Sequence, residues 1–367
     1  MNFSWRRIFY LLVMMAGLPA AGMLLAGRSL APYLEFPSRN CFVAHAGFSW
    51  LVFALIGVLV LACALPFVLR YFAMVFGRKA GSSDVPGVSN RGFPWWGWLG
   101  VGFLALAWIL AWTRFSWFAA LQRHTFTPLW IAYVVVVNAL TWRRTGRCLL
   151  THSTGRFLVL FPCSAAFWWL FEYLNRYVQN WHYTAEQFSA AEYFWYATLP
   201  FSTVLPAVLS TREWLLSFPG WQRAFAHAWV VRMPRSRLAS GAVFLFATLG
   251  LMGIGIFPNG LYPLLWVSPL LLMLSWQTLA GEETPFHGVA KGDWREVVGC
   301  AVAALICGWF WEMWNYYSLA KWFYTVPYVN RFHVFEMPLL GFAGYLPFGL
   351  ECMMAAAWLT RTDETTL

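Results

Sequence analysis

Long runs of apolar residues are the feature that most constrains this chain. Residues 48–69, for example, contain no charged side chain, and about 20 mainly apolar residues are enough to cross a bilayer. Of the 367 residues, 60% are hydrophobic and only 11% are charged, whereas soluble domains average about 45–50% and about 25%. The sequence therefore predicts an all-α, polytopic membrane helix bundle.

The length rule leads us to expect ten segments, of which 128–142 and 193–209 are short, and the charges between them predict their orientation. If the segments alternate across the membrane, 18 of the 25 Lys and Arg residues fall on one side and 7 on the other. Because cytoplasmic loops carry the excess of these residues, we expect a multi-pass protein of the cytoplasmic membrane with both termini cytoplasmic. The expected segments lie near residues 8–27, 48–69, 96–113, 128–142, 157–175, 193–209, 239–257, 261–280, 297–319 and 336–360.

An internal repeat divides the chain into three expected units. The stretch 168–183 recurs at 308–324, with identical residue types at matched positions. This predicts a two-helix N-terminal unit with a basic loop (1–95), a four-helix repeat with an interfacial loop (96–237) and a second four-helix repeat with a short tail (238–367). Because four crossings return the chain to its starting side, we expect the repeats to be parallel. The matched pairs are Trp169 and Trp309, Glu172 and Glu312, Asn175 and Asn315, Trp181 and Trp322, and Tyr183 and Tyr324.

The matched glutamates, Glu172 and Glu312, are candidate catalytic residues near the outer ends of their segments. The pattern W-x-x-E-x-x-N places three side chains within about a third of the helix circumference. A carboxyl group at that depth normally faces protein or a cavity rather than lipid. Exclusion of water favours the protonated, uncharged form of the carboxyl group. A residue that acts as a proton donor must be in that form. Alternatively, Glu and Asn only bridge helices while the aromatic residues form an interfacial belt.

Further polar candidates occur in the second repeat. Glu351 lies well inside the last segment, behind Pro347, and is expected to be a third catalytic acid or else a salt-bridged or snorkelling residue. Glu336 lies at the outer start of that segment, and His333 either extends the polar cluster or is simply solvated. The expected substrate-binding residues are Asn175, Asn315, Trp169, Trp309, Trp181, Trp322, Tyr183, Tyr324, Glu336 and His333.

No sequence motif indicates a metal or a cofactor, and we expect neither. The seven cysteines contain no C-x-x-C, and the seven histidines fall in loops or at segment edges, which argues against a metal centre or b-type haem. The net charge of +10 is not gathered in a basic domain, which argues against nucleic acid. Membrane lipids and a hydrophobic small molecule are the expected partners. The sequence does not indicate an oligomeric state.

A buried acid among aromatic side chains suits carbocation chemistry, because aromatic faces stabilise a cation. The repeat also resembles the small membrane lycopene cyclases of the heterodimer type and related carotenoid hydratases. The resemblance implies that the acid protonates an isoprenoid alkene, leading to cyclisation or hydration. In those families the acid and the Asn are adjacent, whereas two residues intervene here, and Ser210 replaces the last acid in the first repeat. The corresponding residues are Glu312, Asn315, Trp322, Tyr324, Pro347 and Glu351.

Three classes of function remain open on the sequence. The first is an enzyme or binding protein that acts on a hydrophobic lipid from the outer half of the membrane. The second is a proton-coupled transporter or channel, since parallel repeats and buried carboxyl groups also occur in carriers. A transporter should have polar residues along its whole path, and the cytoplasmic half offers few besides Glu351. The third is a non-catalytic scaffold subunit.

Overall fold

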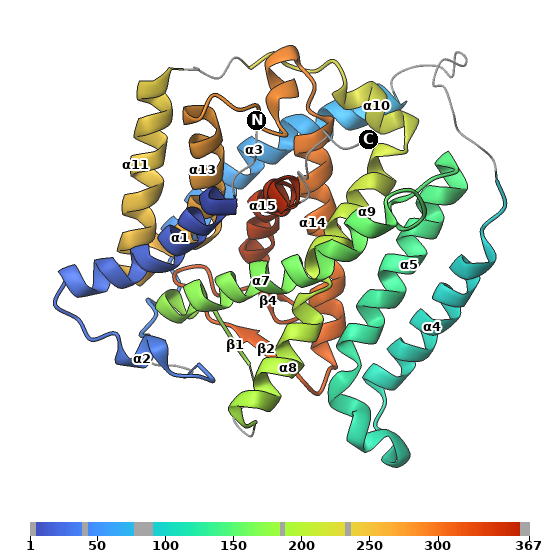
Figure 1. Ribbon diagram of the computed structural model, residues 1–367, viewed down its shortest axis with the longest axis horizontal. Helices are drawn as coiled ribbons and strands as arrows, with labels where there is room; N and C mark the ends of the chain where they lie inside the picture. Colours follow the sequence, from blue (N-terminus) through green and yellow to red (C-terminus); the bar gives the residue numbers. More distant parts are fainter. Residues whose placement is uncertain (1–4, 39–42, 77–90, 184–187, 232–235, 360–367) are drawn as a thin grey trace.

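The fold is almost entirely helical, which confirms the predicted class. The computed structural model describes residues 5–38, 43–76, 91–183, 188–231 and 236–359, of which helices form the great majority and strands only a few short pieces. Figure 1 shows the short strands β1, β2 and β4 among the helices, in the lower middle of the molecule as drawn. The long helices are α1 (Trp5–Leu25), α3 (Trp50–Phe76), α4 (Trp95–Trp112), α5 (Phe126–Thr145), α7 (Thr154–Val178), α8 (Ala190–Phe201), α9 (Val204–Leu216), α11 (Arg237–Gly253), α13 (Leu264–Leu279), α14 (Arg295–Tyr316) and α15 (Tyr345–Leu359).

Short elements connect these helices. The short α-helices are α2 (Ala31–Leu34), α6 (Leu149–His152), α10 (Pro219–Phe225) and α12 (Pro258–Leu261). The 3₁₀ helices are η1 (Ser116–His124), η2 (His287–Lys291) and η3 (Leu339–Gly344). The strands form two antiparallel pairs: β1 (Trp181–Tyr183) with β2 (Trp322–Tyr324), and β3 (His333–Val334) with β4 (Met337–Pro338).

The helices support a multi-pass membrane protein. Five elements are long and apolar enough to cross a bilayer, namely α3, α4, α7, α14 and the stretch Leu339–Trp358, and the bent pair of η1 and α5 makes a sixth candidate. Three further apolar stretches are shorter than this criterion requires, namely Phe9–Leu25 within α1, and the helices α11 and α13. The count of ten crossings and the division into two four-helix repeats therefore remain predictions.

The sixth predicted segment, 193–209, is not one continuous helix. The chain breaks after α8 and restarts as α9, with Ser202 and Thr203 between them. The break falls between Pro200 and Pro206, and proline lacks the amide hydrogen that a continuing helix needs. Pro206 lies in the first turn of α9, where that hydrogen would have no helical partner anyway.

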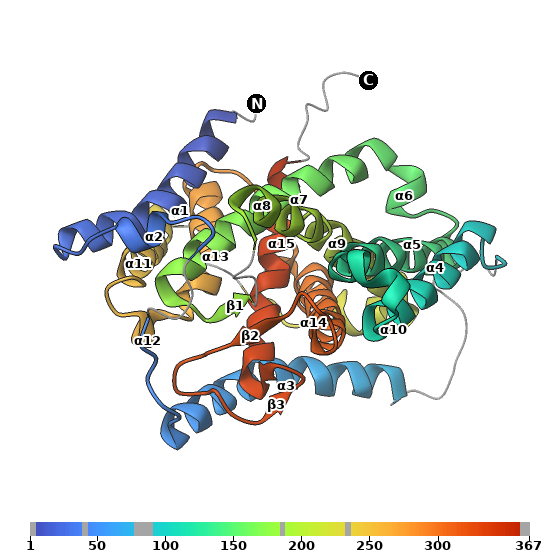
Figure 2. The same cartoon turned by 90° about the horizontal axis from the view of Figure 1, so that it is seen from below.

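Helix α3 lies along the outside of the molecule, as Figure 2 shows. It has a mean hydropathy of 2.9 over its most apolar stretch, and none of its residues is buried. An exposed apolar surface of this length is unusual on a soluble monomer. In a bilayer the same surface contacts lipid at no cost, so the exposure of α3 agrees with a membrane location.

The helices do not all share one direction, as they would in a simple up-and-down bundle. Figure 1 shows α14 at full length and α15 nearly along its own axis, whereas Figure 2 shows α15 at full length and α14 nearly end-on. Glycines permit this close crossing. A side chain at Gly349 of α15 would collide with the backbone carbonyl of Cys300 on α14, and one at Gly308 would collide with the Tyr345 ring.

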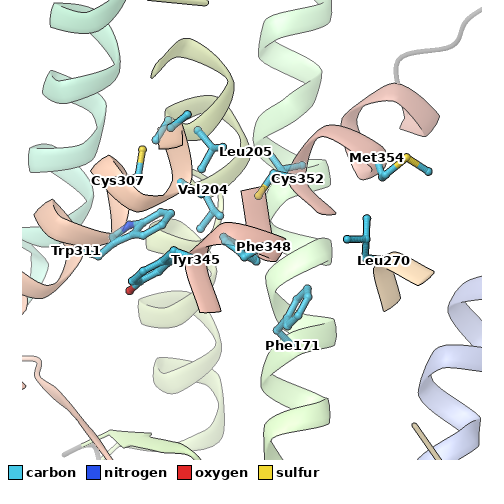
Figure 3. Close-up of a cluster of buried hydrophobic side chains, with 14 of the residues drawn as sticks. Phe171, Val204, Leu205, Leu270, Cys307, Trp311, Tyr345, Phe348, Cys352 and Met354 are labelled. Atoms are coloured by element: carbon cyan, nitrogen blue, oxygen red, sulfur yellow. The ribbon is translucent and has the colours of Figure 1, made fainter. Parts of the chain in front are cut away.

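Aromatic and aliphatic side chains fill the crossing. Figure 3 shows Trp311, Tyr345 and Phe348 lying together, with Val204 of α9 beside them and Phe171 of α7 below. The ring centroids of Trp311 and Tyr345 are 5.8 Å apart and nearly stacked. This core therefore joins α7 and α9 to α14 and α15, so it packs the helices of the first predicted repeat against those of the second.

Gly349→Ala tests whether the close crossing supports the fold. Its new methyl group would meet a backbone atom that no rotamer change can remove, so we expect a loss of roughly 1–3 kcal/mol in the free energy of unfolding. Thermal unfolding of the purified protein in detergent measures the loss. The matched control is Gly102→Ala on α4, where a methyl group meets nothing within 4 Å and helix propensity alone should raise stability. Equal behaviour of the two variants would contradict the explanation.

Candidate functional site

A cavity of about 420 Å³ lies beside this core, within the size range of pockets that hold small molecules. We call it the aromatic cavity because 14 of its 33 lining residues are Trp, Tyr or Phe. Helix α3 closes part of it with Ile56 and Leu59. Residues from both predicted repeats line it. The aromatic residues used below are Trp168, Trp181 and Tyr183 from the first repeat and Trp266, Trp311, Trp322, Tyr324 and Tyr345 from the second.

The two matched Trp-x-Tyr elements meet directly as strands β1 and β2. Trp181 lies opposite Tyr324, and Tyr183 lies opposite Trp322. The strand pair is therefore symmetric, because the tryptophan of each strand lies opposite the tyrosine of the other. All four side chains line the aromatic cavity. These four sequence-predicted residues are therefore brought together at one site.

Each matched asparagine holds its own strand in place. The amide nitrogen of Asn175 donates to the carbonyl oxygen of Trp181 at 2.7 Å, and its side-chain oxygen accepts from the backbone N–H of Asn180 at 2.9 Å. Asn315 donates to the carbonyl oxygen of Trp322 at 2.8 Å and accepts from the N–H of the same residue at 2.9 Å. Neither asparagine lines the aromatic cavity. Their shared role here is to attach a strand to the end of a helix.

Glu172 holds three aromatic side chains of its own repeat. Its Oε1 accepts hydrogen bonds from the indole N–H groups of Trp168 and Trp181 at 2.9 and 3.0 Å, and from the hydroxyl of Tyr183 at 2.6 Å. The carboxyl group is buried and does not itself line the aromatic cavity, whereas all three donors do. Glu172 therefore fixes part of the cavity wall from behind.

Glu312 occupies the matched position and is fully buried. Its Oε1 accepts hydrogen bonds from the hydroxyls of Tyr324 and Tyr345, each at 2.7 Å. Trp322 reaches this group indirectly, because its indole N–H donates to the hydroxyl of Tyr324 at 2.9 Å. The second oxygen, Oε2, has no hydrogen-bond partner among the described residues. Glu312 is thus separated from the cavity by two tyrosine hydroxyls.

Each carboxyl group also has one donor that lies outside the strand pair, and this donor comes from a different helix in each half. In the alignment of the repeats, Trp168 matches Gly308 and Val204 matches Tyr345. The first half has its extra donor, Trp168, on the same helix as Glu172. In the second half Gly308 leaves that space open, and the ring of Tyr345 from α15 occupies it. The large donor on the helix of the first half is thus replaced by glycine in the second half, and a large donor on α15 takes its place beside the carboxyl group.

The tyrosines of the strands are neutral hydrogen-bond donors. Burial raises the pKa of Tyr324 well above its ordinary value, and the neighbouring Glu312 raises it further. The pKa of Tyr183 is raised in the same way, by burial and then by Glu172. Both hydroxyls therefore keep their protons throughout the physiological pH range.

Other predicted site residues lie away from the aromatic cavity. Glu351 is buried between α13 and α15, where its Oε1 accepts from the backbone N–H of Leu270 at 3.2 Å. Glu336 forms an ion pair with Lys321, and exposed His333 contacts the side chain of Asn330. None of these three predicted residues lines the cavity.

The matched tryptophans of the W-x-x-E pattern also point elsewhere. The indole N–H of Trp169 donates to the hydroxyl of Thr198 at 2.9 Å. The ring of Trp309 is about half exposed and packs against Phe335. Neither lines the aromatic cavity, whereas their neighbours Trp168 and Trp311 do. Their predicted role in substrate binding therefore has no support from their placement.

Sequence reasoning overlooked Trp168 and Tyr345, the donors that are not matched between the repeats. A search for identical residues at matched positions passes over both. Trp168 lies one helical turn before Glu172, a spacing at which side chains meet on a helix. Tyr345 precedes the matched Pro347 by two residues, but nothing in the sequence alone places it against Glu312.

No known protein family, no curated protein and no solved structure matches this chain. The resemblance to lycopene cyclases and carotenoid hydratases therefore remains a prediction that rests on the residues alone.

Asn315→Ala and Asn175→Ala test the attachment of the strands. Each change removes hydrogen bonds to buried backbone groups, and we expect roughly 1–3 kcal/mol of lost stability for each. Thermal unfolding in detergent measures the effect, with Asn330→Ala, an exposed asparagine, as the control. If both variants unfold at the same temperature as the control, the asparagines do not hold the strands.

Proposed function

We propose that this membrane protein binds a hydrophobic, isoprenoid-type lipid in the aromatic cavity and transforms it by acid chemistry, with Glu312 as the acid. The observation that carries the proposal is the buried carboxyl group of Glu312, whose two hydrogen-bond donors, Tyr324 and Tyr345, both line the cavity. We place the site at the extracytoplasmic side of the membrane, as the charge distribution predicts.

The cavity wall fits an unsaturated hydrocarbon chain. Its lining is predominantly apolar. The ring centroid of Trp181 lies 6.2 Å from that of Trp168 and 5.3 Å from that of Trp266. Protonation of an alkene leaves a carbocation, and the electron-rich faces of such rings attract a cation. Among aromatic rings, the face of Trp attracts a cation most strongly. The tryptophans of the wall therefore suit this reaction better than simple storage of a saturated chain.

The proton reaches the lipid through a tyrosine in this proposal. Glu312 does not line the cavity, so the hydroxyl of Tyr324 or Tyr345 first turns its hydrogen from Glu312 toward the cavity, and the protonated carboxyl group then donates to that hydroxyl oxygen. The acid proton moves to the hydroxyl oxygen while the hydroxyl gives its own proton to the alkene carbon. A phenol hydroxyl both donates and accepts, so the tyrosine ends as it began and Glu312 becomes the carboxylate. The raised pKa of Tyr324 agrees with a relay that never leaves a phenolate.

Glu172 takes a positioning role in the proposal. Three donors converge on one of its oxygens, so any movement of this carboxyl group shifts three side chains of the cavity wall. Glu351 has no part in the relay, because neither Glu351 nor its hydrogen-bond partner Leu270 lines the cavity. The acid chemistry thus rests on the second half of the chain and the first half completes the wall.

Extraction of bound lipid tests where the ligand lies. We expect purified protein to retain a defined isoprenoid that mass spectrometry detects, and Gly344→Trp to lose most of it by filling the cavity. Gly344 lines the cavity and a Cβ atom there meets nothing within 4 Å, so the new side chain can leave the backbone without a clash and the fold should persist. The control is Gly102→Trp on the exposed face of α4.

The outcomes separate the three classes of function. Equal lipid content in both variants would place the lipid outside the cavity. Absence of a defined lipid, together with proton-driven solute uptake into vesicles, would favour a transporter. Absence of both would favour a scaffold.

Deuterium exchange tests Glu312 as the acid. Protonation of an alkene and loss of a proton from the cation carry solvent deuterium into the lipid without any co-reactant. In deuterated buffer we expect the protein to label geranylgeraniol, a neutral isoprenoid alcohol, and we expect Glu312→Gln to bind it without labelling it. Mass spectrometry gives the label, and Glu282→Gln in the loop after α13 is the control. Labelling by Glu312→Gln at the normal rate would remove Glu312 from this role.

A further inference from the structure

Two basic side chains line the aromatic cavity, which is otherwise dominated by apolar groups. They are Arg123, at the end of η1, and Lys321, just before β2. Among the described residues that line the cavity there is no Asp or Glu. The wall therefore carries positive charge that no acidic group of the wall balances.

The two basic residues belong to short segments of the cavity wall that meet through an aromatic contact. Arg123 precedes Phe126 by three residues, and Lys321 directly precedes Trp322. The rings of Phe126 and Trp322 are in edge contact, with their centroids 5.3 Å apart, and both line the cavity. This contact brings the two short segments side by side next to the strand pair.

The charge of Arg123 is the less compensated of the two. Lys321 forms an ion pair with Glu336 and donates to the carbonyl oxygen of Tyr316. Arg123 lies over the ring of Phe188, 5.2 Å from its centroid, and makes no ion pair within the described part of the chain. Glu192, an acid near enough to feel its charge, is already bonded to Ser189. A guanidinium group in this state offers paired N–H donors that match phosphate or carboxylate oxygens.

We propose that the ligand is an amphiphile, an isoprenoid chain that ends in an anionic headgroup such as a phosphate. The headgroup contacts Arg123 and Lys321, and the chain extends into the aromatic cavity. This inference rests on the proposed function and narrows its substrate class, because a pure hydrocarbon has no group for the basic part of the cavity wall.

The exposure of the two residues suits such an arrangement. Arg123 is exposed, while the side chain of Lys321 retains only 20% of its full exposure. A headgroup between them keeps part of its contact with water, so its charge need not be buried in hydrocarbon. The aromatic wall beginning at Trp322 and Tyr324 then receives the chain. The ligand is thereby oriented with one fixed end, and a fixed end determines which of its double bonds meets Tyr324 and Tyr345.

Binding of a matched pair of ligands tests the proposal. The full chain in neutral detergent is titrated with geranylgeranyl monophosphate and with geranylgeraniol, which share one chain, and with inorganic phosphate. Quenching of tryptophan fluorescence reports occupancy of the cavity. We expect the monophosphate to bind at least about tenfold more tightly than the alcohol. Inorganic phosphate alone should show no saturable binding in this range, because it lacks the chain.

Arg123→Gln assigns the preference to the basic part of the cavity wall. We expect this variant to lose most of the preference for the monophosphate while its affinity for the alcohol stays unchanged. The control is Arg143→Gln, an exposed arginine near the opposite end of α5, which should keep the full preference.

Three results would overturn the inference. Equal affinity of the unaltered protein for the monophosphate and the alcohol would exclude an anionic headgroup but leave the lipid-binding function intact. A preference that survives in Arg123→Gln would place the headgroup elsewhere. Failure of both lipids to bind would overturn the proposed function together with this inference.

Discussion

Two carboxyl groups buried next to aromatic side chains determine the arrangement of the site. A carboxyl group away from water requires hydrogen-bond donors, and in this fold the donors are the side chains of Trp and Tyr. Glu172 and Glu312 therefore select the orientation of the rings that contact them. The same contacts also hold the strands. Trp181, Tyr183 and Tyr324 donate hydrogen bonds to these acids and belong to the β1 and β2 pair. The cavity is the space left inside this framework.

The two halves use different residues to supply hydrogen-bond donors to their buried carboxyl groups. Gly308 and Tyr345 in the second half replace Trp168 and Val204 in the first. The consequence is that Glu172 is held mainly by its own helix and the adjoining strand, whereas Glu312 depends on α15. A displacement of α15 relative to α14 would remove a donor from Glu312 and none from Glu172. The two acids are therefore unequal in their surroundings even though their positions match.

The sequence predicted the helical class and a multi-pass membrane protein, because apolar runs dictate helices in a bilayer. The repeat identified Trp181, Tyr183, Trp322 and Tyr324 as matched residues, and it did not by itself place them opposite one another in β1 and β2. It did not predict Tyr345 beside Glu312, since that contact depends on the crossing of α14 and α15 through Gly349. The repeat favoured Trp169 and Trp309 as substrate-binding residues because they match. In the structure it is the neighbouring Trp168 that donates a hydrogen bond to Glu172. Identity between repeats identifies shared structure more reliably than it identifies the residues of a cavity.

Helix α3 has one further consequence. It contributes Ile56 and Leu59 to the cavity wall, yet none of its residues is buried by the rest of the protein. Helix α3 thus forms a part of the cavity wall whose other face is available to lipid. A molecule that reaches the cavity past α3 travels within the plane of the membrane and never dissolves in water. Its supply then depends on its mole fraction among the surrounding lipids, not on its aqueous solubility.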